Sequence, residues 1–183
     1  FYYKKINIQV PALPDLQVLS VVPPENSLSG QSVTVVATII NKGVATKSNA
    51  SWCDEIFISP TNEFDETTAK SLDKVYHRGG LDAGEQYTVP FEVTIPAGYA
   101  GAYYFFVKTN VYENVYEHAL SENNMAVSEK TIQVIASPTS DIVALSLDLP
   151  VRIDGATSLA IHGKGKNGGL ADTDVSSWTD YVY

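Results

Sequence analysis

The sequence contains little sulfur and few basic residues. Its 183 residues include one cysteine, Cys53, and one methionine, and 12 lysines and arginines stand against 21 aspartates and glutamates, which gives a net charge of −9. A single cysteine excludes an internal disulfide. Nucleic-acid binding needs clustered basic residues, which this composition does not supply, so we expect no nucleic-acid partner.

Long apolar runs and helical periodicity are also missing. No stretch approaches the roughly 18 apolar residues that span a bilayer, so we expect no membrane insertion. The chain begins on Phe1 without a charged segment followed by an apolar one, and we interpret it as a piece of a longer protein. The apolar fraction of 44% is ordinary for a globular fold, so a packed core is expected.

Apolar residues alternate with polar ones along most of the chain, which is the pattern of half-buried strands. The clearest cases are residues 33–40 and 87–95, and the aromatic-rich run 102–109 is apolar enough for a central strand. Pro90 predicts that its strand lies at a sheet edge or carries a bulge. Further short strands are expected at 16–22, 52–59, 75–76 and 126–135, with a polar stretch at 60–74. The sequence therefore predicts an all-β fold, a two-sheet antiparallel sandwich, with a closed barrel as the alternative.

A degraded copy of the region from Gly30 to Ser59 closes the sequence. Asn41, Gly43, Trp52 and Asp54 recur 126 positions later as four further residues, which are Asn167, Gly169, Trp178 and Asp180. Four landmark residues held at one spacing indicate a structural repeat. The copy has lost core bulk, because Gly163 and Gly165 stand where the first copy has Ala37 and Ile39.

The repeat divides the chain into three parts. Residues 1–10 resemble residues 130–134 and are expected to be the last strand of a preceding repeat. Residues 14–136 are expected to form one complete unit, and residues 140–183 the N-terminal part of a following, truncated repeat. Because a last strand and first strands of one fold are complementary, we expect that the fragment can form a strand-exchanged dimer.

Several short motifs occur in an order that resembles the CARDB domain, a cell-adhesion-related module of bacteria and archaea. They are Pro14-Asp15-Leu16, Gly30 before the alternating strand, Asn41-Lys42-Gly43, Trp52 to Ser59, Leu81 to Gly84, Ile95 to Gly98, Gly101 to Tyr104, and Glu117 followed by Ser121 to Asn124. The resemblance covers residues 14–136 and resumes at Ser140. It implies an immunoglobulin-like antiparallel β-sandwich that occurs in tandem in secreted or cell-surface proteins. It implies no catalytic residues.

Histidine and cysteine show no catalytic or metal-binding pattern. His77, His118 and His162 fall in an expected turn, a loop and a strand, without the short spacing of metal ligands. We interpret all three as solvated surface residues and Cys53 as a packed strand residue. No catalytic residue and no cofactor-binding residue is predicted.

Asp54 is the acidic residue whose placement needs an explanation. It has the same strand parity as Trp52 and Ile56, so it should point toward the core, where a carboxylate needs hydrogen-bond donors or a cation. One interpretation places Asp54 at the rim of the sandwich, accepting bonds from turn amides. The alternative is a Ca²⁺ ion that would take further oxygens from Asp65 and Glu66, or from Glu117, Glu122 and Asn124.

Two groups of aromatic residues are candidates for different tasks. Trp52 and Trp178 match the central tryptophan of a sandwich core and are expected to be buried. Tyr99, Tyr112 and Tyr116 lie in expected loops, where they could cover the core or stack on a sugar ring.

The sequence therefore predicts a non-catalytic structural and adhesive module of an extracellular or cell-surface protein. Its expected partners are other domains of the same parent protein and an extracellular protein or glycan. The alternative is a carbohydrate-binding accessory module of an extracellular enzyme.

Overall fold

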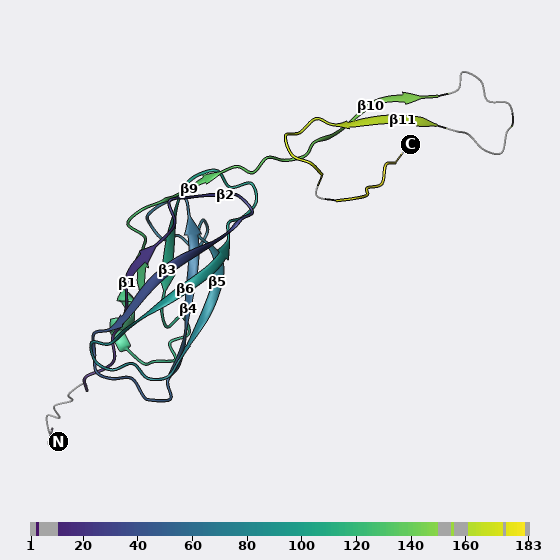
Figure 1. The fold of residues 1–183 in the computed structure, drawn as a ribbon. Coiled ribbons are helices and arrows are strands. Elements are labelled where there is room, and N and C mark those ends of the chain that lie inside the picture. The colour runs from purple at the N-terminus through teal and green to yellow at the C-terminus, as the bar shows by residue number, and fades with distance from the viewer. Residues whose placement is uncertain (1–2, 4–10, 150–154, 156–160, 174, 182–183) are drawn as a thin grey trace. The chain divides into compact units, whose positions relative to one another are not determined.

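A computed structural model describes residues 3, 11–149, 155, 161–173 and 175–181 (Figure 1). The chain forms two compact units, Phe1–Ala136 and Ser137–Tyr183. The strand predicted over residues 1–10 lies outside the described residues except for Tyr3.

The first unit contains two β-sheets, whose strands run along its length (Figure 1). One sheet has the order β1-β3-β6, formed by Leu16–Val22, Ser32–Asn41 and Gln86–Thr94. The other has the order β2-β9-β7-β4-β5, formed by Asn26–Leu28, Ile132–Ile135, Gly101–Lys108, Ser51–Ser59 and Lys70–Arg78, with β8 (Met125–Val127) also paired to β7. All pairs are antiparallel except β2 with β9. The predicted immunoglobulin-like β-sandwich is confirmed.

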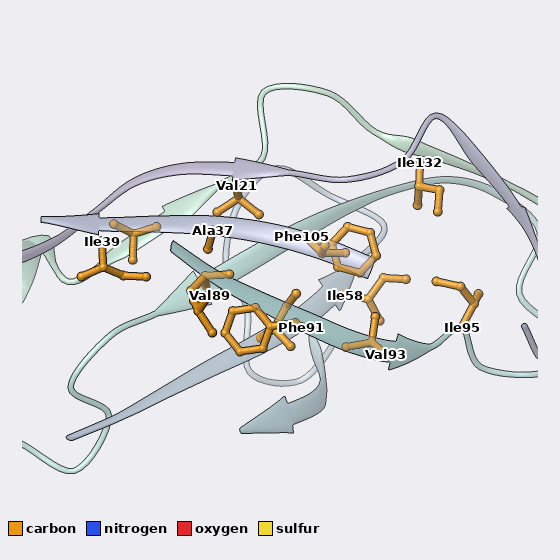
Figure 2. Close-up of a cluster of buried hydrophobic side chains, with 14 of the residues drawn as sticks. Val21, Ala37, Ile39, Ile58, Val89, Phe91, Val93, Ile95, Phe105 and Ile132 are labelled. Carbon is orange, nitrogen blue, oxygen red and sulfur yellow. The ribbon is translucent and has the colours of Figure 1, made fainter. Parts of the chain in front are cut away.

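The core lies between the two sheets, where the predicted alternation places the apolar side chains. Val35, Ala37 and Ile39 of β3 are fully buried, as are Phe91 of β6 and Phe105 of β7. Figure 2 shows the labelled side chains gathered into one cluster. Burial of apolar surface on this scale is the main source of stability for such a fold.

Two strand positions follow from the sequence as predicted. β6, which carries Pro90, pairs with β3 and forms the edge of its sheet. β7 pairs with β4, β8 and β9 and is therefore central.

Three elements differ from the prediction. β5 begins at Lys70 and not near residue 75, because an edge strand with one solvent-facing side accepts polar residues. The single strand predicted over 126–135 is two strands, β8 and β9, since the polar residues 128–131 separate them. A short 3₁₀ helix, η1 (His118–Asn123), interrupts the long loop before β8. None of the helices among the described residues has the length and apolar character that crossing a membrane requires.

The second unit contains an antiparallel pair, β10 (Ile142–Asp148) and β11 (His162–Asn167). The pair repeats the register of β1 with β3 at the 126-residue spacing, since Leu16 pairs with Asn41 and Ile142 with Asn167. Each first strand also carries a register shift at the equivalent place, between residues 18 and 20 and between residues 144 and 146. The two pairs therefore share a backbone irregularity in addition to their sequence landmarks.

Candidate functional sites

A buried amide side chain fixes the segment that enters β1. Asn41, at the end of β3, is fully buried. Its Oδ1 accepts hydrogen bonds from the Asp15 and Gly43 amides, both at 3.1 Å, and its Nδ2 donates to the carbonyls of Val44 at 2.8 Å and Leu81 at 3.0 Å. One side chain thus joins the entering segment, the turn after β3 and the turn before β6.

Gly43 allows the entering segment to pass at backbone distance. A Cβ atom on Gly43 would lie 2.1 Å from the Leu13 carbonyl oxygen and 2.6 Å from the Asp15 nitrogen. The Val44 amide donates to that Leu13 oxygen at 3.1 Å, and the Lys42 amide donates to the Asp15 carbonyl at 2.8 Å. Any side chain at position 43 would displace these contacts. We call Asn41, Gly43 and the segment 13–15 the linker clamp.

The second unit contains an equivalent clamp. Asn167 Oδ1 accepts from the Asp141 and Gly169 amides, both at 2.9 Å. A Cβ atom on Gly169 would lie 2.2 Å from the Thr139 carbonyl oxygen, and the Leu170 amide donates to that oxygen at 3.1 Å. The same contacts at the same spacing show that this geometry is specified twice in the chain.

The segment before β1 also borders a second surface of the first unit. A cavity of about 290 Å³ is lined by residues 11–13 and by residues 117–120, the start of η1 and its neighbour. The entering segment therefore has structural neighbours on two sides, the turn after β3 and the η1 region.

Glu117 anchors the η1 region to β1. Its carboxylate is 2% exposed and accepts hydrogen bonds from the Leu16 amide, from Asn110 Nδ2 at 2.6 Å and from Asn124 Nδ2 at 2.8 Å. Three donors around one buried carboxylate satisfy it without a basic partner. The sequence gave little sign that Glu117 anchors η1 to β1, because the Leu16 amide is 101 positions away.

Asp54 points into the sandwich, as its strand parity predicts. It is 1% exposed, and its Oδ2 accepts a hydrogen bond of 2.6 Å from the Tyr87 hydroxyl, which in turn accepts 2.9 Å from Trp52 Nε1. The partner is thus a hydroxyl from β6 of the opposite sheet. Burial raises the pKa of Asp54, and the nearby hydroxyls of Thr109 and Tyr87 and the Asn110 amide partly oppose this rise.

The raised pKa of Asp54 predicts a stability that falls as the pH rises. Because the folded-state pKa lies above the unfolded one, the stabilising contribution is present below the unfolded pKa and is lost as the pH passes the folded pKa. We expect Asp54→Asn to remove this loss of stability at rising pH. The buffer contains a chelator, so that bound cations do not contribute to the measurement. Urea unfolding at a series of pH values above the ordinary pKa of an aspartate measures the slope of stability against pH.

Asp65→Asn provides the control for this measurement. Asp65 is exposed, and hydrogen bonds from Thr67 lower its pKa. The contribution of Asp65 to stability is therefore lost as the pH falls, whereas that of Asp54 is lost as the pH rises. Equal slopes for the wild type and Asp54→Asn would contradict the assignment.

One histidine departs from the prediction. His77 lies on β5 and not in a turn, is half-buried, and stacks on Trp52 with ring centroids 4.2 Å apart. Burial lowers its pKa. The prediction of a solvated His77 is wrong because β5 is longer than its sequence pattern indicates. His118 and His162 are exposed, and Cys53 is buried, as expected.

The acidic residues proposed as Ca²⁺ ligands separate into different places. Asp65 Oδ1 accepts from the Thr67 amide in its own loop at 2.8 Å, and Glu66 lines a hollow on the outer face of the β4 sheet. Glu122 is exposed, whereas Asn124 is buried beside Glu117. Among the described residues no group of three or more His, Cys, Asp or Glu side chains could hold a metal ion.

The two tryptophans differ. Trp52 is 1% exposed, as predicted, whereas Trp178 is 57% exposed. The prediction for Trp178 is wrong because Trp52 is covered by Leu81 and Val115, and residues 137–183 contain no counterparts of these positions. Asp180, the counterpart of Asp54, is likewise exposed.

The three candidate tyrosines make separate contacts. Tyr99 stacks on Tyr103 with ring centroids 4.8 Å apart, and Tyr112 accepts a hydrogen bond of 3.0 Å from Lys74. Tyr116 is 67% exposed. The described contacts do not bring them together into one surface.

Comparisons with known proteins identify the family of this sandwich domain. The family model CARDB matches residues 13–129, more than half of the chain, and the chain belongs to the CARDB family. This is a non-catalytic, adhesion-related domain family. No curated protein matches the chain.

Solved structures similar to this chain include three of different kinds. The CARDB domain of a Pyrococcus furiosus protein, solved in complex with di-metal ions, has 17% identity and a TM-score of 0.47, covering 74% of this chain and 100% of that one. A mutant β-glucosidase from Listeria innocua in complex with laminaribiose has 20% identity and a TM-score of 0.39, covering 68% of this chain and 16% of the enzyme. Superoxide reductase from Ignicoccus hospitalis has 13% identity and a TM-score of 0.34, covering 64% of this chain and 82% of that one.

Proposed function

We propose that this chain is a non-catalytic structural and adhesive module of a secreted or cell-surface prokaryotic protein, in which CARDB-like units in tandem act as spacers and as protein-interaction units. The observation that carries the proposal is the recurrence of the linker clamp. Each clamp binds the backbone that enters its own unit, so each unit fixes the direction in which the chain arrives.

The anchoring points at the junction lie close together in sequence. The Ile135 carbonyl accepts a hydrogen bond of 2.9 Å from the Ser29 amide in the first unit, and the Thr139 carbonyl accepts 3.1 Å from the Leu170 amide in the second. Residues 136–138 lie between these points and include Pro138, which restricts its own φ angle. A short, anchored junction of this kind suits a spacer better than a freely flexible linker does.

The partners proposed for the module are the neighbouring domains of its parent protein and an extracellular protein or glycan. The strand-exchanged dimer is also a proposal. Light scattering of the full chain and of residues 12–137 tests it, and two monomeric masses would contradict it.

We expect Gly169→Ala to release the junction from the second unit. The added Cβ would lie 2.2 Å from the Thr139 carbonyl oxygen, so the clamp must open. Backbone order parameters of residues 137–141, measured by ¹⁵N relaxation, should fall from about 0.85, typical of rigid backbone, to about 0.6 or less.

Gly163→Ala is the matched control on the same strand pair. A Cβ atom there meets its nearest neighbour, a Leu147 methyl carbon, at 3.9 Å, which is an ordinary contact. Its order parameters should equal those of the wild type. Unchanged order parameters in Gly169→Ala would contradict the anchoring role of the clamp.

The second candidate function is a carbohydrate-binding accessory module. The observation in its favour is that Tyr112 and Tyr116 are 52% and 67% exposed, which leaves ring surface for stacking on a sugar. On a glycan array, saturable binding that disappears in Tyr112→Ala and Tyr116→Ala would favour this function over the spacer.

A further inference from the structure

Three inward-facing oxygen-bearing side chains lie in one row: Asp54 of β4, Thr109 directly after β7 and Asn124 directly before β8. Glu55 of β4 pairs with Lys108 of β7, and Lys108 pairs with Met125 of β8. One residue further toward the same end of the sheet are Asp54, Thr109 and Asn124, the last two just outside their strands. The Thr109 amide donates to the Asn124 carbonyl at 2.9 Å, which extends the β7–β8 register to this row.

The row faces the interior of the sandwich. Glu55, Lys108 and Met125 line the hollow on the outer face of the sheet, and successive side chains of a strand point to opposite faces. Asp54, Thr109 and Asn124 are accordingly 1%, 0% and 2% exposed. Neighbouring side chains in such a row have Cβ atoms about 5 Å apart, so Asp54 and Asn124 stand about 10 Å apart with Thr109 between them.

By hydrogen-bond geometry, each member of the row retains a buried oxygen without a partner among the described residues, although the Thr109 hydroxyl and the Asn110 amide lie close enough to Asp54 to stabilise its charged form. These atoms are Asp54 Oδ1, Thr109 Oγ1 and Asn124 Oδ1. The other atoms of the same groups are engaged, because Asp54 Oδ2 accepts from Tyr87 and Asn124 Nδ2 donates to Glu117. Unpartnered buried polar atoms are rare in folded proteins, and three in one row indicate a shared ligand.

The electrostatic environment of the row favours a cation. Asp54 and Glu117 are both buried, and the only ion pair among the described residues joins Lys74 to Glu55, which lines the outer hollow. A water molecule could donate to the orphaned oxygens, but it would not offset the charge of the carboxylate. An all-oxygen set of carboxylate, hydroxyl and amide suits a hard cation.

We propose that Asp54 Oδ1, Thr109 Oγ1 and Asn124 Oδ1 bind a hard cation of the Ca²⁺ class inside the first unit. The site uses a single carboxylate with two neutral oxygens, so it differs in kind from a cluster of acidic residues. Bound there, the cation would join β4, β7 and β8 at the end of the sheet where Glu117 holds η1 against β1.

Terbium luminescence of the full chain tests this site directly, because Tb³⁺ occupies oxygen sites for Ca²⁺ and is sensitised by a nearby indole. Trp52 Nε1 lies 2.9 Å from the Tyr87 hydroxyl, which lies 2.6 Å from Asp54. We expect saturable emission that CaCl₂ displaces, that survives Trp178→Phe and that is lost in Asp54→Asn. Glu66→Gln, which changes an acidic residue lining the outer hollow, should leave it unchanged.

Thermal unfolding gives an independent readout. A ligand that binds only the folded state raises the unfolding temperature, here by about 10 °C when CaCl₂ exceeds its Kd about a hundredfold and the reference contains EDTA. Thr109→Val keeps the shape of the side chain and removes the hydroxyl, so it should reduce this rise in unfolding temperature. If Asp54→Asn does not fold, the result for Thr109→Val tests the cation site. Equal unfolding temperatures in CaCl₂ and EDTA, or emission that persists in both variants, would overturn the proposal in favour of a buried water or a protonated Asp54.

Discussion

Replacing Phe91 by alanine is expected to lower the free energy of unfolding of the first unit by about 4 kcal/mol. Phe91 is fully buried on β6, within the cluster that both sheets contribute to (Figure 2). β6 is an edge strand with a paired strand on one side only. The cavity left by Phe91 would therefore remove side-chain packing that holds β6 against the opposite sheet. Urea unfolding followed by circular dichroism measures the loss.

Phe57→Ala is the control, because it removes the same group from the other side of the β4 sheet. Phe57 is half-buried and contacts Phe64 at a ring-centroid distance of 5.2 Å in the outer hollow. Its loss should cost about half as much or less, since little new cavity forms at an open surface. Equal costs for the two substitutions would mean that the core does not lie between the sheets.

Replacing Asn41 by alanine is expected to cost about 3 kcal/mol, although no charge and little volume are lost. The amides of Asp15 and Gly43 and the carbonyls of Val44 and Leu81 would lose their partner. Removing one partner from buried polar groups costs their desolvation, and here a single side chain serves several of them. The free energy of unfolding, measured with urea, reports the effect.

Asn167→Ala makes the same chemical change in the second unit. Asn167 accepts equivalent bonds from the Asp141 and Gly169 amides and donates to the Ala171 carbonyl, but it is exposed, so water can replace these bonds. The unfolding free energy of the first unit should change by less than about 0.5 kcal/mol. A loss below about 1 kcal/mol in Asn41→Ala would show that water reaches the first clamp as well.

Much of the fold could be predicted because alternation reports burial directly. The strands over 33–40 and 87–95 were recognisable from one apolar face, and Pro90 marked an edge. β5 was less visible because its solvent-facing edge position relaxes the pattern. η1 was missed because six residues of 3₁₀ helix carry no periodic signal.

The candidate sites show a different limit. Strand parity was enough to direct Asp54 inward, but its partner Tyr87 is on another sheet and is 33 positions away. Thr109 joins the row through the register of β4 with β7, which parity within one strand does not define. The clamp had one available signal, namely that Asn41 and Gly43 recur together at residues 167 and 169.

Amide hydrogen exchange across the two clamps tests most directly whether this chain repeats a unit that holds its own linker. The Gly43 and Val44 amides donate within the first clamp, and the Gly169 and Leu170 amides donate within the second. We predict slowed exchange at all four amides. Slow exchange at 43 and 44 together with the rate of an unstructured peptide at 169 and 170 would contradict the account.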